Sequence, residues 1–278
     1  DWRKINEVLY KHQEFGVQIK SRGFYKNALD DAKSKSSSEE ELMMHIHNHV
    51  SSQIKWNGQN ALFVEKNIKS AYDTQSGNAA DINLTLISML NAAGIKTDPV
   101  ILSTRSNGII NTNALILKKY NYVVALAHVN GKKVLLDATD PFLPCGVLPV
   151  RCLNQHGRVV AENGIGDWIN LTPQVGNYLA TSSRLSVSED GIMHGIIQVK
   201  REGYNGLLLR QNLREKGEES YKESLMVKYP GWKIDKIAFS DAETGDGIIE
   251  EIHLSIESGI QVMGNTMYID PYIMEKLQ

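Results

Sequence analysis

The sequence predicts an α+β protein: a helical N-terminal part leads into a small sheet, and a second part is rich in strands. Three observations carry this prediction. Residues 79–93 have the apolar spacing of a buried helix. Residues 120–139 alternate like two strands around Asn130-Gly131, a dipeptide typical of a two-residue hairpin turn. After residue 180, alternating strand patterns dominate the rest of the chain.

The composition excludes several classes of protein. Of the 278 residues, 42% are hydrophobic and 22% are charged, which is typical of a globular protein. The formal net charge of -2 removes the electrostatic basis for a nucleic-acid partner. No apolar run approaches the roughly 18 to 20 residues that a membrane helix needs. We therefore expect no nucleic-acid partner and no membrane span in this segment.

The change of pattern near residue 180 predicts two domains. Residues 1–180 would form the α+β core, and residues 181–278 a β-sandwich-like domain with a charged helix inserted near 207–229. The last strand signal runs into Pro271, which makes the second domain a candidate for truncation. Because the chain starts at Asp1 without Met or a signal peptide, we expect a processed or excised piece.

Helices are expected at the start of the chain. Residues 1–34 carry a rough helical stripe, interrupted by Gly16, and a capping-box-like Ser38 starts the next helix. On that helix the three histidines suggest a metal site, but only His45 and His49 share a helix face. We therefore expect an exposed helix face and no metal. The three histidines are His45, His47 and His49.

The helix over residues 79–93 has a clear start and end. Asn78 is a good N-cap, and Asp81 can reach back to it three residues later. Gly94 followed by Ile95 fits a glycine that ends a helix. We expect this helix to be mostly buried against the sheet.

The two-residue turn also fixes the register of the hairpin. Tyr122 should lie opposite Thr139, and Val124 opposite Asp137. Because side chains alternate along a strand, Tyr122 and Asp137 should be diagonal neighbours on one face. A buried helix, then strands, then a hairpin that carries an acid is the element order of papain-like thiol enzymes. In these enzymes a Cys at the helix N-terminus is the nucleophile, a His is its base, and an Asp orients the His.

Specific segments resemble the transglutaminase-like superfamily. Ser76-Gly-Asn-Ala-Ala-Asp81 and the Ala-Ala-Gly-Ile that ends its helix resemble the family's Gly-Asp-Cys-x-Asp…Ala-Gly-Ile signature. Asn121-Tyr-Val-Val and Asp137-Ala-Thr-Asp140 resemble its Asn-His-Val…Asp-x-Thr segment. Gly146-Val-Leu-Pro149 and Gly157-Arg-Val-Val160 resemble its bacterial envelope branch, where uncharacterised β domains labelled DUF3857 and DUF3858 flank the core. The resemblance implies a papain-like core, a following β domain and a periplasmic or cell-envelope location.

The same resemblance implies that the catalytic site is degenerate. Ala79 stands at the nucleophile position and Tyr122 at the base position, so only Asp137 of the Cys-His-Asp triad remains. A methyl group cannot attack a carbonyl, and a Tyr with a pKa of about 10 is a poor base at neutral pH. Asp137 is then either a relic of the triad or an ordinary strand-end acid that caps local backbone. The family's Asp before the nucleophile is Asn78 here, which makes Asn78 a groove candidate.

Two further features leave alternatives open. Cys145 and Cys152 could form a short-loop disulfide or two free thiols, and the only His nearby in sequence is His156. We expect ordinary semi-buried thiols, with a displaced nucleophile as the alternative. Trp56 could line a binding groove or anchor the core.

Together these features predict a non-catalytic, transglutaminase-like protein that binds or scaffolds in the bacterial cell envelope. Its old substrate groove would hold a peptide or glycan-peptide, or the protein would present a surface to a partner protein. No cofactor is expected. The first alternative is a cysteine-dependent hydrolase or acyl transferase, peptidase-like, that uses Cys145 or Cys152. The second is a structural spacer in a longer multidomain chain.

Overall fold

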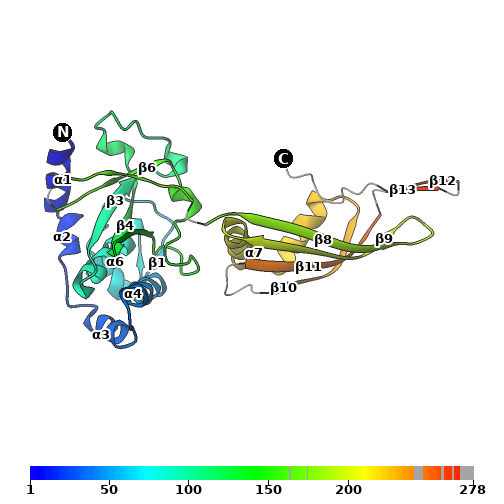
Figure 1. The fold of residues 1–278 in the computed structure, drawn as a ribbon, viewed down its shortest axis with the longest axis horizontal. Helices are drawn as coiled ribbons and strands as arrows, with labels where there is room; N and C mark the ends of the chain where they lie inside the picture. Colours follow the sequence, from blue (N-terminus) through cyan, green and yellow to red (C-terminus); the bar gives the residue numbers. More distant parts are fainter. Residues whose placement is uncertain (163, 174, 241–246, 258–259, 265, 270–278) are drawn as a thin grey trace. The chain divides into compact units, whose positions relative to one another are not determined.

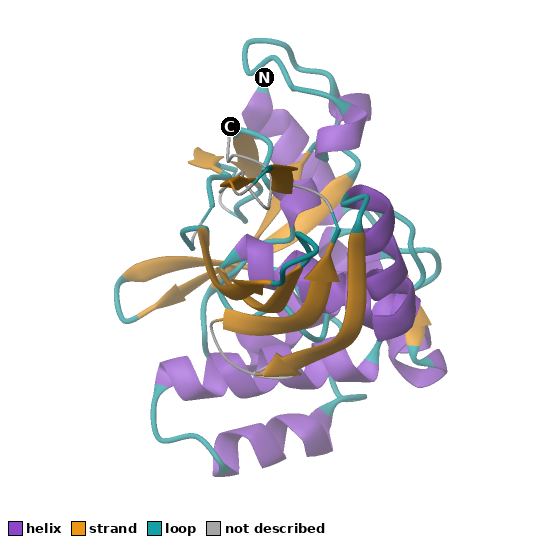
Figure 2. Cartoon of the chain, turned by 90° about the vertical axis from the view of Figure 1, so that its right-hand side faces the viewer, coloured by secondary structure: helices purple, strands orange, loops and turns teal. Residues whose placement is uncertain are grey.

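The computed structural model describes residues 1–162, 164–173, 175–240, 247–257, 260–264 and 266–269. The chain divides into two compact units, Asp1–Gln174 and Val175–Gln278 (Figure 1). The sequence predicts the boundary after residue 180, but that point lies inside a strand that begins at Tyr178. The second unit therefore starts earlier than expected. Each unit combines helices with strands (Figure 2).

Helices make up the first part of the N-terminal unit. The segment predicted as one interrupted helix over residues 1–34 is three separate helices. The second of them begins at Gly16, which lies so close to Tyr10 that a Cβ at Gly16 would be 2.2 Å from the Tyr10 carbonyl oxygen. The helices are α1 (Trp2–Lys11), α2 (Gly16–Ile19), α3 (Lys26–Ser34), α4 (Glu39–Gln53), α5 (Ile68–Thr74) and α6 (Ala79–Ala93).

A five-stranded antiparallel sheet forms the second part of this unit, in the order β5-β4-β3-β6-β7. Val129 pairs with Lys132 and Ala125 with Leu136, which is the register that the two-residue turn predicts. Asn130 and Gly131 both have positive φ, as this turn requires. The strands are β3 (Thr97–Leu102), β4 (Tyr122–Val129), β5 (Lys132–Leu136), β6 (His156–Val159) and β7 (Trp168–Asn170).

Both faces of the sheet are buried. Helix α6 packs on β3 and β4, and nearly all of its residues are inaccessible to solvent, as the sequence predicts. Side chains on the other face of these strands, among them Tyr122 and Val124, pack with Leu148 and Cys152 from the proline-rich crossing after the hairpin. A short 3-10 helix, Val150–Cys152, lies in that crossing. Two short parallel strands, β1 (Lys55–Trp56) and β2 (Ser76–Gly77), lead into α6.

The C-terminal unit has one four-stranded antiparallel sheet, in the order β10-β11-β9-β8. A helical segment, Tyr204–Lys228, packs against it and is kinked at Gly217, whose φ of 82° and ψ of 163° are not helical. The sequence predicts two packed sheets here. In the described residues a helical layer takes the place of the second sheet, because Leu209, Tyr221 and Leu225 cover the apolar face of the first. A small hairpin follows. The elements are β8 (Tyr178–Val187), β9 (Met193–Glu202), α7 (Tyr204–Lys228), β10 (Trp232–Ser240), β11 (Gly247–Ile256), β12 (Ile260–Met263) and β13 (Thr266–Ile269). Among the helices of the described residues, none has the length and apolar character that crossing a bilayer requires.

Candidate functional site

Helix α6 begins at Ala79 because a complete capping box holds its first turn. The Asn78 side chain accepts a hydrogen bond from the Asp81 backbone N–H at 2.9 Å, and the Asp81 carboxylate accepts one from the Asn78 N–H at 2.9 Å. The Asn78 amide also donates to the Phe63 carbonyl at 3.1 Å. Asn78 is buried by these contacts, and its polar groups are engaged in holding the helix start. The Ala79 methyl group is fully buried.

Two N–H donors converge on a single oxygen beside this helix start. The Gln59 carbonyl oxygen accepts from the Ala79 backbone N–H at 3.1 Å and from Trp56 Nε1 at 3.0 Å. Paired donors aimed at one oxygen are the geometry that stabilises an oxyanion in acyl transfer. Here the oxygen belongs to the chain itself, so the donors are already used.

Tyr122 and Asp137 form a buried hydrogen-bonded pair in the core of the N-terminal unit. Tyr122 begins β4 and Asp137 directly follows β5, so the hairpin register brings them together. The Tyr122 hydroxyl donates to Asp137 Oδ2 at 2.9 Å. Both side chains are wholly inaccessible to solvent, and Tyr122 shares one apolar cluster with Ala79. The register argument from the sequence therefore locates this contact correctly.

The Asp137 carboxylate has hydrogen-bond donors on both oxygens. Asn83 Nδ2, one turn along α6 from Ala79, donates to Oδ2 at 3.0 Å. The Thr139 N–H donates to Oδ1 at 2.9 Å, and the Thr139 hydroxyl donates to the same oxygen. Each carboxylate oxygen of Asp137 therefore has donors from the chain itself, and the side chain is held in one orientation.

Arg151 covers this pair and closes the site. Its Nη2 atom donates to the Tyr122 hydroxyl at 3.0 Å and to Thr139 Oγ1, and it lies 4.0 Å from Asp137 Oδ1. The guanidinium lies 4.1 Å from the centroid of the Trp56 ring and 5.5 Å from that of Tyr122. The side chain is only 25% exposed. Trp56 is partly buried, packs against the core, and its ring faces the guanidinium of Arg151.

The electrostatics of the site oppose proton transfer by Tyr122. Burial, followed by the negative charge of Asp137, raises the pKa of Tyr122 well above its usual value. Tyr122 is therefore a neutral hydroxyl at physiological pH. It can donate a hydrogen bond to Asp137, but it cannot act as a general base there.

The sequence analysis does not predict that His47 is buried. The histidine-bearing helix α4 is predicted to be exposed beside its apolar stripe, but His47 is 1% exposed and lies on the buried face with Met43 and Val50. The His47 Nε2 atom is 2.8 Å from the Asp137 carbonyl oxygen, and because a carbonyl only accepts, the ring N–H donates this hydrogen bond. His45 and His49 contact Ser36 and Tyr72 instead. In the part of the chain that the structure describes, no group of three metal-ligating side chains comes together.

The two cysteines are free thiols, which resolves the choice between a disulfide and two thiols. Cys152 is fully buried and belongs to the same apolar cluster as Ala79 and Tyr122. Burial, followed by the charge of Asp137, raises the pKa of Cys152 well above its usual value. Burial also raises the pKa of Cys145 to about 12. Neither thiol is an activated thiolate.

We therefore expect both cysteines to resist alkylation in the folded protein. At pH 8 a raised pKa of about 12 leaves Cys145 with on the order of a thousandfold less thiolate than an ordinary thiol with a pKa of 9.0. The measurement is iodoacetamide labelling followed by mass spectrometry, with the urea-unfolded protein as the control for full reactivity. Rapid labelling of Cys152 in the folded protein, with a titration midpoint below pH 8, would contradict this description of the site.

Comparisons with known proteins give remote similarities. No protein-family model matches the sequence, and no curated protein matches it. The crystal structure of a putative protease from Parabacteroides distasonis is similar at 16% identity and a TM-score of 0.42, over 92% of this chain and 52% of that one. A putative cysteine protease from Cytophaga hutchinsonii is similar at 12% identity and a TM-score of 0.32, over 44% of this chain and 41% of that one. This chain spans about half the length of the first of these proteins, and similarity at this level assigns no family.

Proposed function

We propose that this chain is a non-catalytic, transglutaminase-like domain that binds or scaffolds in the bacterial cell envelope. The observation that carries the proposal is the closed site: a buried methyl group stands at the helix start, and Arg151 covers the Tyr122–Asp137 pair. Covalent catalysis needs a nucleophile within reach of a base, and neither Ala79 nor a neutral Tyr122 supplies one. The family and the envelope location rest on the sequence motifs.

Three further features support the loss of acyl-transfer chemistry. The Gln59 carbonyl already accepts from the two N–H donors at the start of α6. Asp137 is fully bound by Asn83 and Thr139 and has no imidazole partner on its carboxylate among the described contacts. A domain with such a site acts through what it binds, and a peptide, a glycan-peptide or a partner protein is the ligand we propose.

The rival function is a cysteine-dependent hydrolase or acyl transferase that uses Cys152. One observation favours it, because Cys152 shares the apolar cluster of Ala79 and Tyr122. Its burial and raised pKa oppose it, since the thiolate is the nucleophile. The third alternative, a structural spacer, predicts that no ligand binds at all.

A burst assay with an activated ester and a peptide amide separates the first two functions. We expect no acyl-enzyme burst from the parent protein or from Cys152→Ser. We also expect little activity from the double variant Ala79→Cys, Tyr122→His, because the Gln59 carbonyl would still accept from the N–H of residue 79 and from Trp56 Nε1, and Arg151 would still bond to Thr139. Mass spectrometry of the intact protein would detect a trapped acyl group.

Two outcomes would contradict the proposal. A burst from the parent that Cys152→Ser abolishes would identify a working thiol enzyme. A strong burst from the double variant would show that the scaffold is still arranged for catalysis and that the site is not closed. Thermal unfolding of each variant serves as the folding control.

A further inference from the structure

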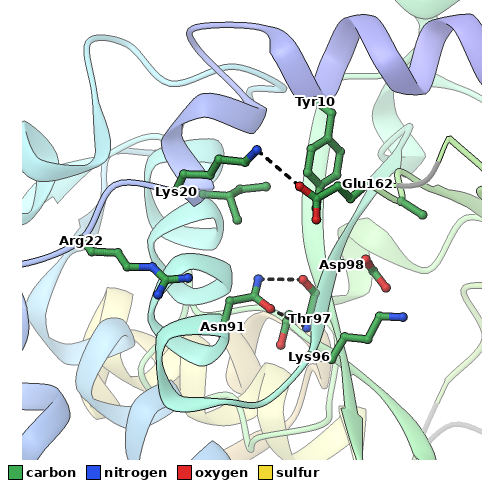
Figure 3. Close-up of a pocket in the computed structure, with 10 residues that line it drawn as sticks. Tyr10, Lys20, Arg22, Asn91, Lys96, Thr97, Asp98 and Glu162 are labelled. Carbon is green, nitrogen blue, oxygen red and sulfur yellow. Dashed lines mark hydrogen bonds and ion pairs between the residues drawn. The ribbon is translucent and has the colours of Figure 1, made fainter.

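A polar hollow lies at the C-terminal end of α6, between α1 and β3 (Figure 3). The Lys20 ammonium is 3.3 Å from Glu162 Oε1, and His128 Nε2 is 3.1 Å from Asp98 Oδ2. The Lys96 side chain lies beside Asp98 (Figure 3). Opposite charges are therefore mixed along the wall, and the hollow presents no surface of one sign. The outer edge of the sheet in the C-terminal unit, in contrast, has a pattern that one kind of partner matches.

Strand β8 has a long open edge. It is the last strand of the β10-β11-β9-β8 sheet, and among the described residues Tyr178–Val187 pair with β9 alone (Figure 1). Unpaired N–H and C=O groups along a strand edge form a template for another strand. Natural edges are blunted by bulges, charges or proline. Strand β8 has a regular register and no proline, and its one charged residue is Arg184.

The opposite edge of the same sheet is protected. Strand β10 has a register irregularity between Ile234 and Lys236, and it carries Lys233, Asp235 and Lys236. A bulge and a series of charges discourage the addition of a strand. The two edges of the sheet therefore differ, and β8 is the edge that can accept a further strand.

The hydrogen bonds to β9 determine which backbone groups of β8 point outward. At the end of this hairpin the Ser188 N–H donates to the Ile192 carbonyl at 2.9 Å, so residue 188 directs its backbone groups to β9. Bonded and non-bonded residues alternate along an antiparallel pair, so the even-numbered residues of β8 are bonded to β9. The odd-numbered residues direct their N–H and C=O groups to the open edge. They are Leu179, Thr181, Ser183, Leu185 and Val187.

The side chains of these odd-numbered residues lie on the face of the sheet that α7 covers. Leu179, Leu185 and Val187 are only partly buried against the apolar cluster there. Segment α7 packs mainly on β9, β10 and β11, so these three side chains lie at the margin of the core. A further strand would bury them more fully if its own apolar side chains lay on the same face.

A second copy of β8 matches this edge in one register. Two antiparallel copies with Ser183 on a two-fold axis place Leu179 opposite Val187 of the other copy, and Thr181 opposite Leu185. All the outward-facing residues then form hydrogen-bonded pairs, with about ten hydrogen bonds in total. Directly opposed residues share a face, so the partly buried apolar side chains of both copies meet on the α7 side.

Charge and preorganisation favour a second copy over an unrelated segment. In this register Arg184 lies opposite Ser182 of the other copy, so no like charges are directly opposed. The partner strand is already extended and bonded to its own β9, whereas a disordered segment would lose conformational entropy on binding. We propose that the chain forms a two-fold dimer in which the β8 strands pair and join two sheets into one. The proposal concerns a separate surface and does not depend on whether the closed site is inactive.

Sedimentation equilibrium of the full chain between about 1 and 200 µM tests the dimer, for which we expect a Kd on the order of 10 µM. Ser183→Pro should weaken association at least about tenfold, because each copy loses the N–H that it donates at the axis. That N–H points away from β9, so the variant should keep the parent's thermal midpoint. Ser183→Ala retains the N–H and is the matched control, with parent-like association. A monomer at every concentration, or parent-like association of Ser183→Pro, would overturn the proposal.

Disulfide trapping tests the register independently of the proline variant. In the proposed dimer the Cα atoms of two Ser183→Cys copies would be about 5.5 Å apart, which a disulfide can bridge. Ser186→Cys is the control: this serine is exposed on the same strand, but its two copies would be about 20 Å apart. We expect oxidised Ser183→Cys to run as a covalent dimer in non-reducing electrophoresis, and Ser186→Cys to run as a monomer. Equal cross-linking of the two variants, or none of Ser183→Cys, would contradict the proposed pairing.

Discussion

Asp137→Ala is expected to lower the free energy of unfolding of the N-terminal unit by about 3–5 kcal/mol. Asp137 is wholly buried, and its carboxylate accepts from Asn83, Tyr122 and Thr139. The substitution leaves these donors without an acceptor, and it leaves the mostly buried Arg151 guanidinium without its counter-charge. Removing one partner from such a network costs far more than removing an exposed charge.

Urea denaturation followed by tryptophan fluorescence measures this effect. Trp2, Trp56 and Trp168 lie in the N-terminal unit, so the signal reports mainly on it. Asp30→Ala is the matched control, because Asp30 forms an exposed ion pair with Lys26, and we expect no resolvable change in the urea midpoint. A parent-like midpoint for Asp137→Ala would show that the carboxylate network does not hold the core together.

The contact between Tyr122 and Asp137 could be predicted from the sequence because the register of one hairpin determines it. The Asn130-Gly131 turn admits one register, and that register brings residue 122 to residue 137. The start of α6 is likewise a local feature, since Asn78 and Asp81 cap each other within one turn. Both predictions needed no knowledge of how distant segments pack.

Arg151 could not be predicted in the same way. It lies in the proline-rich crossing, which has no periodicity, so its approach to Tyr122 depends on the path of the whole segment. His47 did leave a signal, because Met43, Ile46, His47 and Val50 repeat with helical spacing and all are buried.

In the C-terminal unit, too, the sequence predicts the strands but not the layer that packs on them. Alternation identifies its strands well: along β11, buried and partly buried residues alternate from Gly247 to Ile256. Alternation does not say what covers the buried face. The charged segment α7, kinked at Gly217, covers it through a few apolar residues, Leu209, Tyr221 and Leu225 among them. One sheet and this helical layer therefore bury the apolar face where the sequence predicts a second sheet.

Arg151→Ala is expected to destabilise the N-terminal unit by about 3 kcal/mol, because the buried Asp137 would lose the guanidinium that lies 4.0 Å from its Oδ1, and Tyr122 and Thr139 would lose a hydrogen-bond donor. Arg151→Lys should recover only part of this loss. The planar Arg151 guanidinium donates to Tyr122 and Thr139 and also faces the Trp56 ring. A lysine ammonium is a point charge without a planar group, so it cannot make all three contacts.

The Trp56 environment gives this prediction a second readout that general destabilisation does not supply. In the folded Arg151→Ala protein, before the urea transition, Trp56 loses the guanidinium that lies 4.1 Å from its ring, so we expect its emission to shift to longer wavelength. Arg105→Ala, at an exposed arginine, should change neither the midpoint nor the emission. A parent-like urea midpoint and emission for Arg151→Lys would contradict this prediction. The positive charge alone would then explain the contribution of Arg151 to stability, and the contacts of its planar group with Tyr122, Thr139 and Trp56 would not be needed.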